Sequence, residues 1–152
     1  MHVLVTRPEP QATRTAALLA ERGHRTHVAP LAAIEPVPAE LPAPAAVDAV
    51  LLTSANAVPA LRPFLHLPVY TVGDATAAAA RAAGAAQVVS ADGDWLGLAA
   101  LLKGPDGPPA RSRLLHLSGT VVAGDLGGAV RAAGFAYARR PVYTLRPMTA
   151  LP

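Results

Sequence analysis

Short apolar runs alternate along most of the chain with longer, alanine-rich stretches that carry polar residues at intervals. Such apolar runs, bounded by glycine, proline or hydroxyl residues, are typical of buried strands, and the alanine-rich stretches are typical of helices. The predicted strands are residues 3–6, 25–29, 48–53, 69–72, 87–90, 114–117 and 135–145. The predicted helices run from Pro10 to Gly23 and over residues 56–64, 74–83, 95–102 and 121–133. This alternation predicts an α/β protein with a parallel sheet covered on both faces.

The first predicted helix lies between two predicted strands, which indicates a parallel βαβ unit. Its apolar residues are expected to face the core; they are Ala16, Leu18, Leu19 and Ala20. The helix is expected to end at Gly23, because glycine readily adopts the left-handed conformation that follows a helix.

Residues 30–44 interrupt the alternation with five prolines. Proline lacks the backbone N–H that helices and sheet interiors need, so this segment is predicted to be an extended connection. We therefore expect a domain boundary here.

The most informative junction lies at residues 48–58, where an apolar run stops at Thr53 and Ser54 and a helix-compatible stretch with Asn56 begins. In open parallel sheets such strand ends form the edge where ligands bind. Two later junctions have similar chemistry. The candidate binding residues at the three junctions are Thr53, Ser54, Asn56, Gly73, Thr76, Ser118 and Gly119.

The same hydroxyl and amide side chains have a second interpretation as helix caps, which satisfy unpaired backbone N–H groups. In the functional interpretation, the partly positive helix N-termini face a ligand carboxylate. Repetition of the pattern at three junctions favours the ligand interpretation.

Tyr143 lies near the end of the last predicted strand. Its ring could pack beneath a hinge, or its hydroxyl could donate a proton at a cleft. The residues alone leave both alternatives open.

Composition narrows the classes of function. The chain has 152 residues, of which 52% are hydrophobic and 15% charged, so it is a folding sequence. Its net charge of +3 is spread along the chain, which fits an acidic small molecule better than nucleic acid. There is no cysteine, which excludes disulfides and thiol chemistry. No signal pattern begins the chain and no long apolar run suggests a membrane span, so a cytoplasmic location is expected.

Several familiar motifs do not fit. The glycines at 119, 124, 127 and 128 match neither a dinucleotide-binding nor a P-loop pattern. The aspartates at 74, 92, 94 and 125 lack the spacing of metal ligands, so no metal is expected. The five histidines suggest no catalytic triad and are interpreted as surface or core residues.

Taken in order, several segments resemble the uroporphyrinogen-III synthase family. They are VLVTRP at 3–8, AERGH at 20–24, LLTSANAV at 51–58, VYTVGDATA at 69–77, LLHLSGTVVAGDL at 114–126, AAGF at 132–135 and RPVYTLRP at 140–147. The resemblance implies a flavodoxin-like parallel sheet, plus a partial second α/β domain joined to it by a two-stranded connector. Residues 1–35 would begin the first domain, 36–140 would form the inserted domain, and 141–152 would be the return strand and a truncated end. The proline-rich residues 30–38 would pair with that return strand.

The resemblance also implies an activity. Members of the family close hydroxymethylbilane to uroporphyrinogen III with loss of water and inversion of ring D, and they use no cofactor. Tyr143 would help the hydroxyl to leave, and Arg7 would join the junction residues in binding substrate carboxylates. The expected partner is hydroxymethylbilane, with no nucleic acid, no membrane and a monomeric chain.

Two departures from the family pattern bear on this activity. The chain stops where the family continues through the rest of its first domain. The arginine usual in the loop after Gly119 is replaced near Val122 and Ala123. A catalytically inactive module that binds a tetrapyrrole or another polycarboxylate is therefore an alternative, and a domain that only binds a partner protein is a third.

Overall fold

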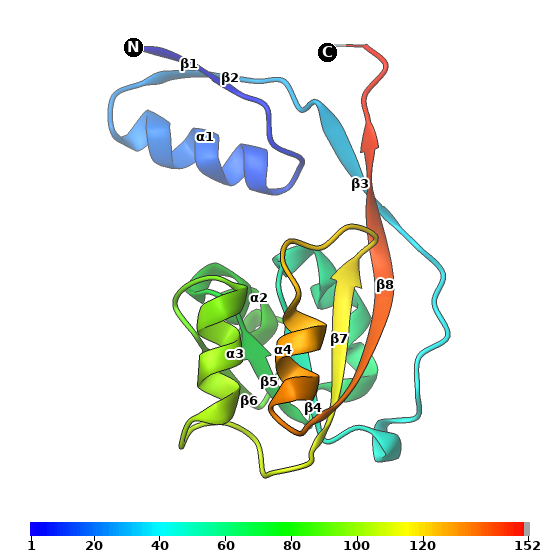
Figure 1. Cartoon of the computed structure of the whole chain (residues 1–152). Helices are drawn as coiled ribbons and strands as arrows, with labels where there is room; N and C mark the ends of the chain where they lie inside the picture. The colour runs from blue at the N-terminus through cyan, green and yellow to red at the C-terminus, as the bar shows by residue number, and fades with distance from the viewer. Residues whose placement is uncertain (151–152) are drawn as a thin grey trace. The chain divides into compact units, whose positions relative to one another are not determined.

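The computed structural model describes residues 1–150, which form two compact units (Figure 1). One unit comprises Met1–Pro36 and the chain from Thr144 onward, and the other comprises Val37–Tyr143. In the described residues, no helix has both the length and the apolar character needed to cross a membrane.

The first unit begins with the predicted βαβ arrangement. Strands β1 (His2–Val5) and β2 (Arg25–Val28) pair in parallel, with helix α1 (Gln11–Glu21) between them in sequence. The helix ends as predicted, because Gly23 adopts a positive φ of 82° directly after the C-cap residue.

The predicted core face of α1 is partly wrong. Leu18 is 59% exposed and Ala20 is also exposed, whereas Ala16 and Leu19 are half-buried. Ala12 is the buried residue of this helix. The reason is the small sheet beneath it: β1 and β2 alone offer too little surface to cover a full apolar stripe.

The proline-rich segment contains a strand that the composition did not indicate. Strand β3 (Ala32–Pro36) lies next to β8 (Ala136–Pro147) in the sheet order, which confirms the pairing implied by the family resemblance. Within the first unit, the backbone N–H of Met148 donates to the carbonyl of Leu31 at 2.8 Å, and Arg146 forms an ion pair with Glu35. Proline is compatible with β3 because the strand lies at the sheet edge.

The second unit is a parallel sheet in the order β8-β7-β4-β5-β6. Its other strands are β4 (Ala49–Leu52), β5 (Pro68–Thr71), β6 (Gln87–Ser90) and β7 (Arg113–Gly119). When the strands of this unit are numbered 1 to 5 in chain order from β4, their order in space is 3-2-1-4-5, whereas flavodoxin itself has the order 2-1-3-4-5. The predicted class, α/β with a parallel sheet, is confirmed. The switch point, where the chain changes sides of its first strand, lies between β4 and β7.

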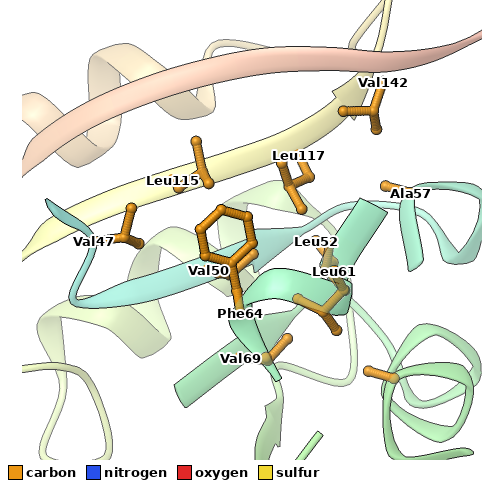
Figure 2. Packing of buried hydrophobic residues seen from close by; sticks show 11 residues of the cluster. Val47, Val50, Leu52, Ala57, Leu61, Phe64, Val69, Leu115, Leu117 and Val142 are labelled. Atoms are coloured by element: carbon orange, nitrogen blue, oxygen red, sulfur yellow. The ribbon is translucent and has the colours of Figure 1, made fainter. Parts of the chain in front are cut away.

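Helices cover both faces of this sheet, as predicted. The helices are α2 (Asp74–Ala82), α3 (Trp95–Lys103), α4 (Leu126–Ala132) and the 3-10 helices η1 (Pro44–Ala46) and η2 (Ala55–Phe64). On one face, η2 and α2 pack against alternate residues of β4, including Val50 and Leu52 (Figure 2). On the other face, α3 and α4 pack against Ala49 and Leu51. All four residues of β4 are fully buried, which explains why the strand is a continuous apolar run.

Two predicted helices differ in detail. The segment after Ser54 is a 3-10 helix because Pro59 and Pro63 interrupt the α-helical hydrogen-bond pattern. The helix predicted over 121–133 begins only at Leu126. Gly124, with a φ of 70°, and the capping residue Asp125 keep the preceding residues in a loop.

Candidate functional site

A pocket of about 420 Å³ lies in the second unit, beside the switch point between β4 and β7. Its residues come from the segments after β4 and β5, from β7 and β8, from the loop before α4, from the start of α3 and from α4. The lining residues are Thr53, Ser54, Val72, Asp94, Trp95, His116, Val121, Val122, Ala123, Gly124, Asp125, Leu126, Gly127, Arg131, Tyr137 and Tyr143. This is the edge at which open α/β sheets bind ligands.

Three of the predicted site residues line this pocket: Thr53, Ser54 and Tyr143. Ser54 also has a structural role, because its Oγ accepts the backbone N–H of Asn56 at 3.2 Å and thereby caps η2. Ser54 therefore caps a helix and lines the pocket at the same time, so the two interpretations of this residue do not exclude each other.

The other predicted residues lie outside the pocket lining. Gly73 is the N-cap of α2, and Thr76 is buried within that helix. Ser118 is also buried; its hydroxyl donates to the carbonyl of Gly119 at 2.8 Å and accepts from Arg139 Nη1 at 3.0 Å.

Asn56 and Arg7 also lie outside the pocket lining. Asn56 belongs to η2 and supplies the N–H that Ser54 caps. Arg7 belongs to the other compact unit, where its Nη1 donates to Thr15 Oγ1 at 3.1 Å.

The structure adds a polar residue that the sequence did not single out. His116 is only 1% exposed, and its two ring nitrogens lie 2.9 Å from Thr53 Oγ1 and 2.7 Å from Tyr137 Oη. Burial, assisted by the charge of Arg139, lowers the pKa of His116 to about 4, so the ring is neutral at pH 7. The available signal was a single polar residue inside the apolar run LLHL.

Charged and aromatic groups surround this histidine. The Arg131 guanidinium lies 4.9 Å from the centre of the Tyr137 ring, a cation–π contact. Burial raises the pKa of Tyr137, although the charges of Arg139 and Arg131 oppose the shift, so the phenol keeps its proton. The pocket therefore offers hydroxyl donors and a cation.

Two aspartates on the pocket wall cap helices. Asp94 Oδ1 accepts the N–H of Gly97 at the start of α3, and Asp125 Oδ1 accepts that of Gly128 at the start of α4, both at 3.0 Å. Their carboxylates thus face positive helix ends while bordering the pocket. The whole lining can accept N–H groups of a ligand as well as donate to its acidic groups.

A parallel α/β sheet with a partly apolar pocket and a few polar groups at its switch point is the arrangement of a small-ligand-binding α/β domain. Residues 13–152 match the family model described as uroporphyrinogen-III synthase HemD. The chain belongs to the uroporphyrinogen-III synthase family. A search of the curated proteins finds no match.

Solved structures agree with the fold. Uroporphyrinogen-III synthetase from Helicobacter pylori is similar with a TM-score of 0.64 and 19% identity, over 98% of this chain and 63% of that one. A mutant uroporphyrinogen III synthase from the extremely thermophilic bacterium Thermus thermophilus is similar with a TM-score of 0.58 and 20% identity, over 97% of this chain and 63% of that one. The chain therefore spans less than two thirds of the length of these neighbours.

Proposed function

We propose that this chain contributes to a lyase of tetrapyrrole and haem biosynthesis, which cyclises hydroxymethylbilane to uroporphyrinogen III. The observation that carries the proposal is the family match over residues 13–152, which includes every residue of the pocket. The reaction loses water and inverts ring D, and a reactive linear substrate of this kind needs chiefly to be held in shape.

The pocket lining suits one pyrrole ring with its acidic arms. Thr53, Ser54 and Arg131 can bind carboxylates by hydrogen bonds and charge, and Asp94 and Asp125 can accept a pyrrole N–H. Trp95 and Tyr137 offer aromatic faces to the ring.

We assign Tyr143 the catalytic role. Its phenol would protonate the hydroxyl group that leaves from the substrate, which is general acid catalysis. No cofactor is assigned, because the reaction is redox-neutral: a C–O bond breaks with loss of water, a C–C bond closes the ring, and the only groups that the protein must supply are proton donors and acceptors. We further propose that the protein acts as a cytoplasmic monomer and binds neither nucleic acid nor membrane.

The test is an assay of the purified chain with hydroxymethylbilane, with separation of the two product isomers. An active enzyme yields uroporphyrinogen III above the amount of isomer I that forms spontaneously. Formation of isomer I alone, at the rate measured without protein, contradicts the synthase activity of this chain.

A binding module without turnover is the second candidate. The observation in its favour is that the whole pocket belongs to the unit Val37–Tyr143. Titration with uroporphyrin, the oxidised porphyrin of the product, distinguishes the candidates, because saturable binding without isomer III formation supports the module.

A further inference from the structure

Three polar side chains from neighbouring strands form a continuous chain along the pocket wall. Tyr137 lies on β8, His116 on β7, and Thr53 directly after β4, and all three line the pocket. Tyr137 Oη lies 2.7 Å from His116 Nδ1, and Thr53 Oγ1 lies 2.9 Å from Nε2. Because the imidazole is almost completely buried, these two contacts satisfy both of its nitrogens.

A neutral imidazole carries one N–H and one bare nitrogen, so the chain has only two hydrogen-bond directions. In the first, Tyr137 donates to Nδ1 and Nε2–H donates to Thr53. In the second, Thr53 donates to Nε2 and Nδ1–H donates to Tyr137. This direction decides whether the hydroxyl hydrogen of Thr53 bonds to His116 Nε2 or faces the pocket.

The chemistry of the two hydroxyls favours the first direction. A phenol is a better donor and a poorer acceptor than an aliphatic hydroxyl, because its oxygen lone pair is shared with the ring. The Arg131 guanidinium over the Tyr137 ring strengthens that donor character. Both distances, 2.7 Å and 2.9 Å, lie within hydrogen-bond range, so the first direction keeps both contacts of the imidazole.

We infer that His116 is a positioning residue, whose Nε2–H fixes the Thr53 hydroxyl as an acceptor and thereby directs the Thr53 hydrogen into the pocket. The hydroxyl then donates to a carboxylate of the ligand, a charge-assisted hydrogen bond. The nature of that ligand rests on the proposed function, but the direction of the hydrogen bonds does not.

The first experiment measures the tautomer directly in the unliganded chain by ¹⁵N NMR of the histidine rings at pH 7. The His116 signals are assigned by their absence in His116→Gln. We expect a bare Nδ1 and a protonated Nε2 in the wild type, and a gain of the other tautomer in Tyr137→Phe, which lacks the donor. A wild-type His116 protonated at Nδ1 overturns the inference.

The second experiment measures uroporphyrin binding by fluorescence titration. Thr53→Val keeps the side-chain shape but lacks the hydroxyl, and we expect its affinity to fall about tenfold or more. Thr53→Ser retains the hydroxyl and should bind within about threefold of wild type. If Thr53→Val binds as tightly as wild type, Thr53 is not the donor and the inference is overturned.

The two experiments separate this inference from the proposed function. If the wild-type chain does not bind uroporphyrin, the proposed function is contradicted. The NMR measurement of the His116 tautomer needs no ligand, so it still decides the direction of the hydrogen bonds. Unfolding midpoints of Thr53→Val and Thr53→Ser serve as the control for folding, and equal midpoints assign an affinity difference to the hydroxyl.

Discussion

The ring of Tyr143 lies directly against Gly119: a Cβ atom at residue 119 would come within 2.9 Å of the ring carbon Cζ and 3.0 Å of the phenol oxygen. The register of β7 and β8 explains this contact. Pairing runs in step from Arg113–Ala136 to Ser118–Pro141, and then β8 contributes an extra residue so that Gly119 faces Tyr143. Such a bulge redirects side chains near functional sites. Gly119 thus positions Tyr143 instead of lining the pocket itself.

We therefore predict that Gly119→Ala displaces the Tyr143 ring. A shift of this kind misplaces the proposed proton donor, so turnover should fall about 10- to 100-fold. The measurement is kcat with hydroxymethylbilane. Gly93→Ala is the matched control, because the nearest atom to a Cβ there is 3.8 Å away. Equal activity of Gly119→Ala and wild type would contradict the positioning role.

Tyr143→Phe tests the phenol itself. Phenylalanine retains the ring but cannot donate a proton, so kcat should fall by about 100-fold or more while uroporphyrin affinity changes much less. Parallel turnover and titration measurements check this. Equal losses in both would mean that the hydroxyl serves binding, and the catalytic assignment would be wrong.

The sequence indicates part of the pocket for a simple physical reason. An apolar run that stops at Thr53 and Ser54 is a strand end, and parallel strands gather their carboxyl ends at one edge. The α/β class can be predicted for the same reason, because strands and helices also show in the local periodicity of apolar residues. The family resemblance added a catalytic role for Tyr143, whose role the residues alone left open.

The remaining features depend on contacts that local patterns do not reveal. His116 meets its partners Thr53 and Tyr137 across 63 and 21 residues of sequence, so its role depends on which strands are neighbours. The loop before α4 lies inside the helix predicted over residues 121–133, whereas in the structure that helix begins at Leu126. In the structure Val121 is 87% exposed and borders the pocket.

The buried, neutral His116 should make stability depend on pH. The pKa of His116 is about 4 in the folded chain, below the ordinary value of 6.5. Above pH 6.5 the ring is therefore mostly neutral in both the folded and the unfolded chain. Between these values the unfolded chain binds a proton that the folded chain does not, and the free energy of unfolding falls as pH falls. The loss by pH 4 should be on the order of 3 kcal/mol.

Urea unfolding at pH 7 and at about pH 4.5, compared between wild type and His116→Gln, isolates this contribution from that of the carboxylates. We expect the variant to lose less stability on acidification. The same dependence in both proteins would show that His116 titrates normally in the folded state.

The Trp95 ring lies against Gly124 in the loop that borders the pocket. A Cβ at residue 124 would collide with the Trp95 ring, and the φ of 70° is itself unfavourable for alanine. Gly124→Ala should therefore cost more than the roughly 1 kcal/mol of backbone strain alone. Because Trp95 is the sole tryptophan, its fluorescence spectrum should shift, and uroporphyrin affinity should fall.

Gly134→Ala is the control that separates strain from contact. Gly134 has a φ of 91°, but no atom lies within 4 Å of a Cβ there. It should therefore lose only the strain energy and leave both the tryptophan spectrum and ligand affinity unchanged. If the two variants lose equal stability and Trp95 reports no change in Gly124→Ala, the loop tolerates the extra carbon and its packing against the indole does not shape the pocket.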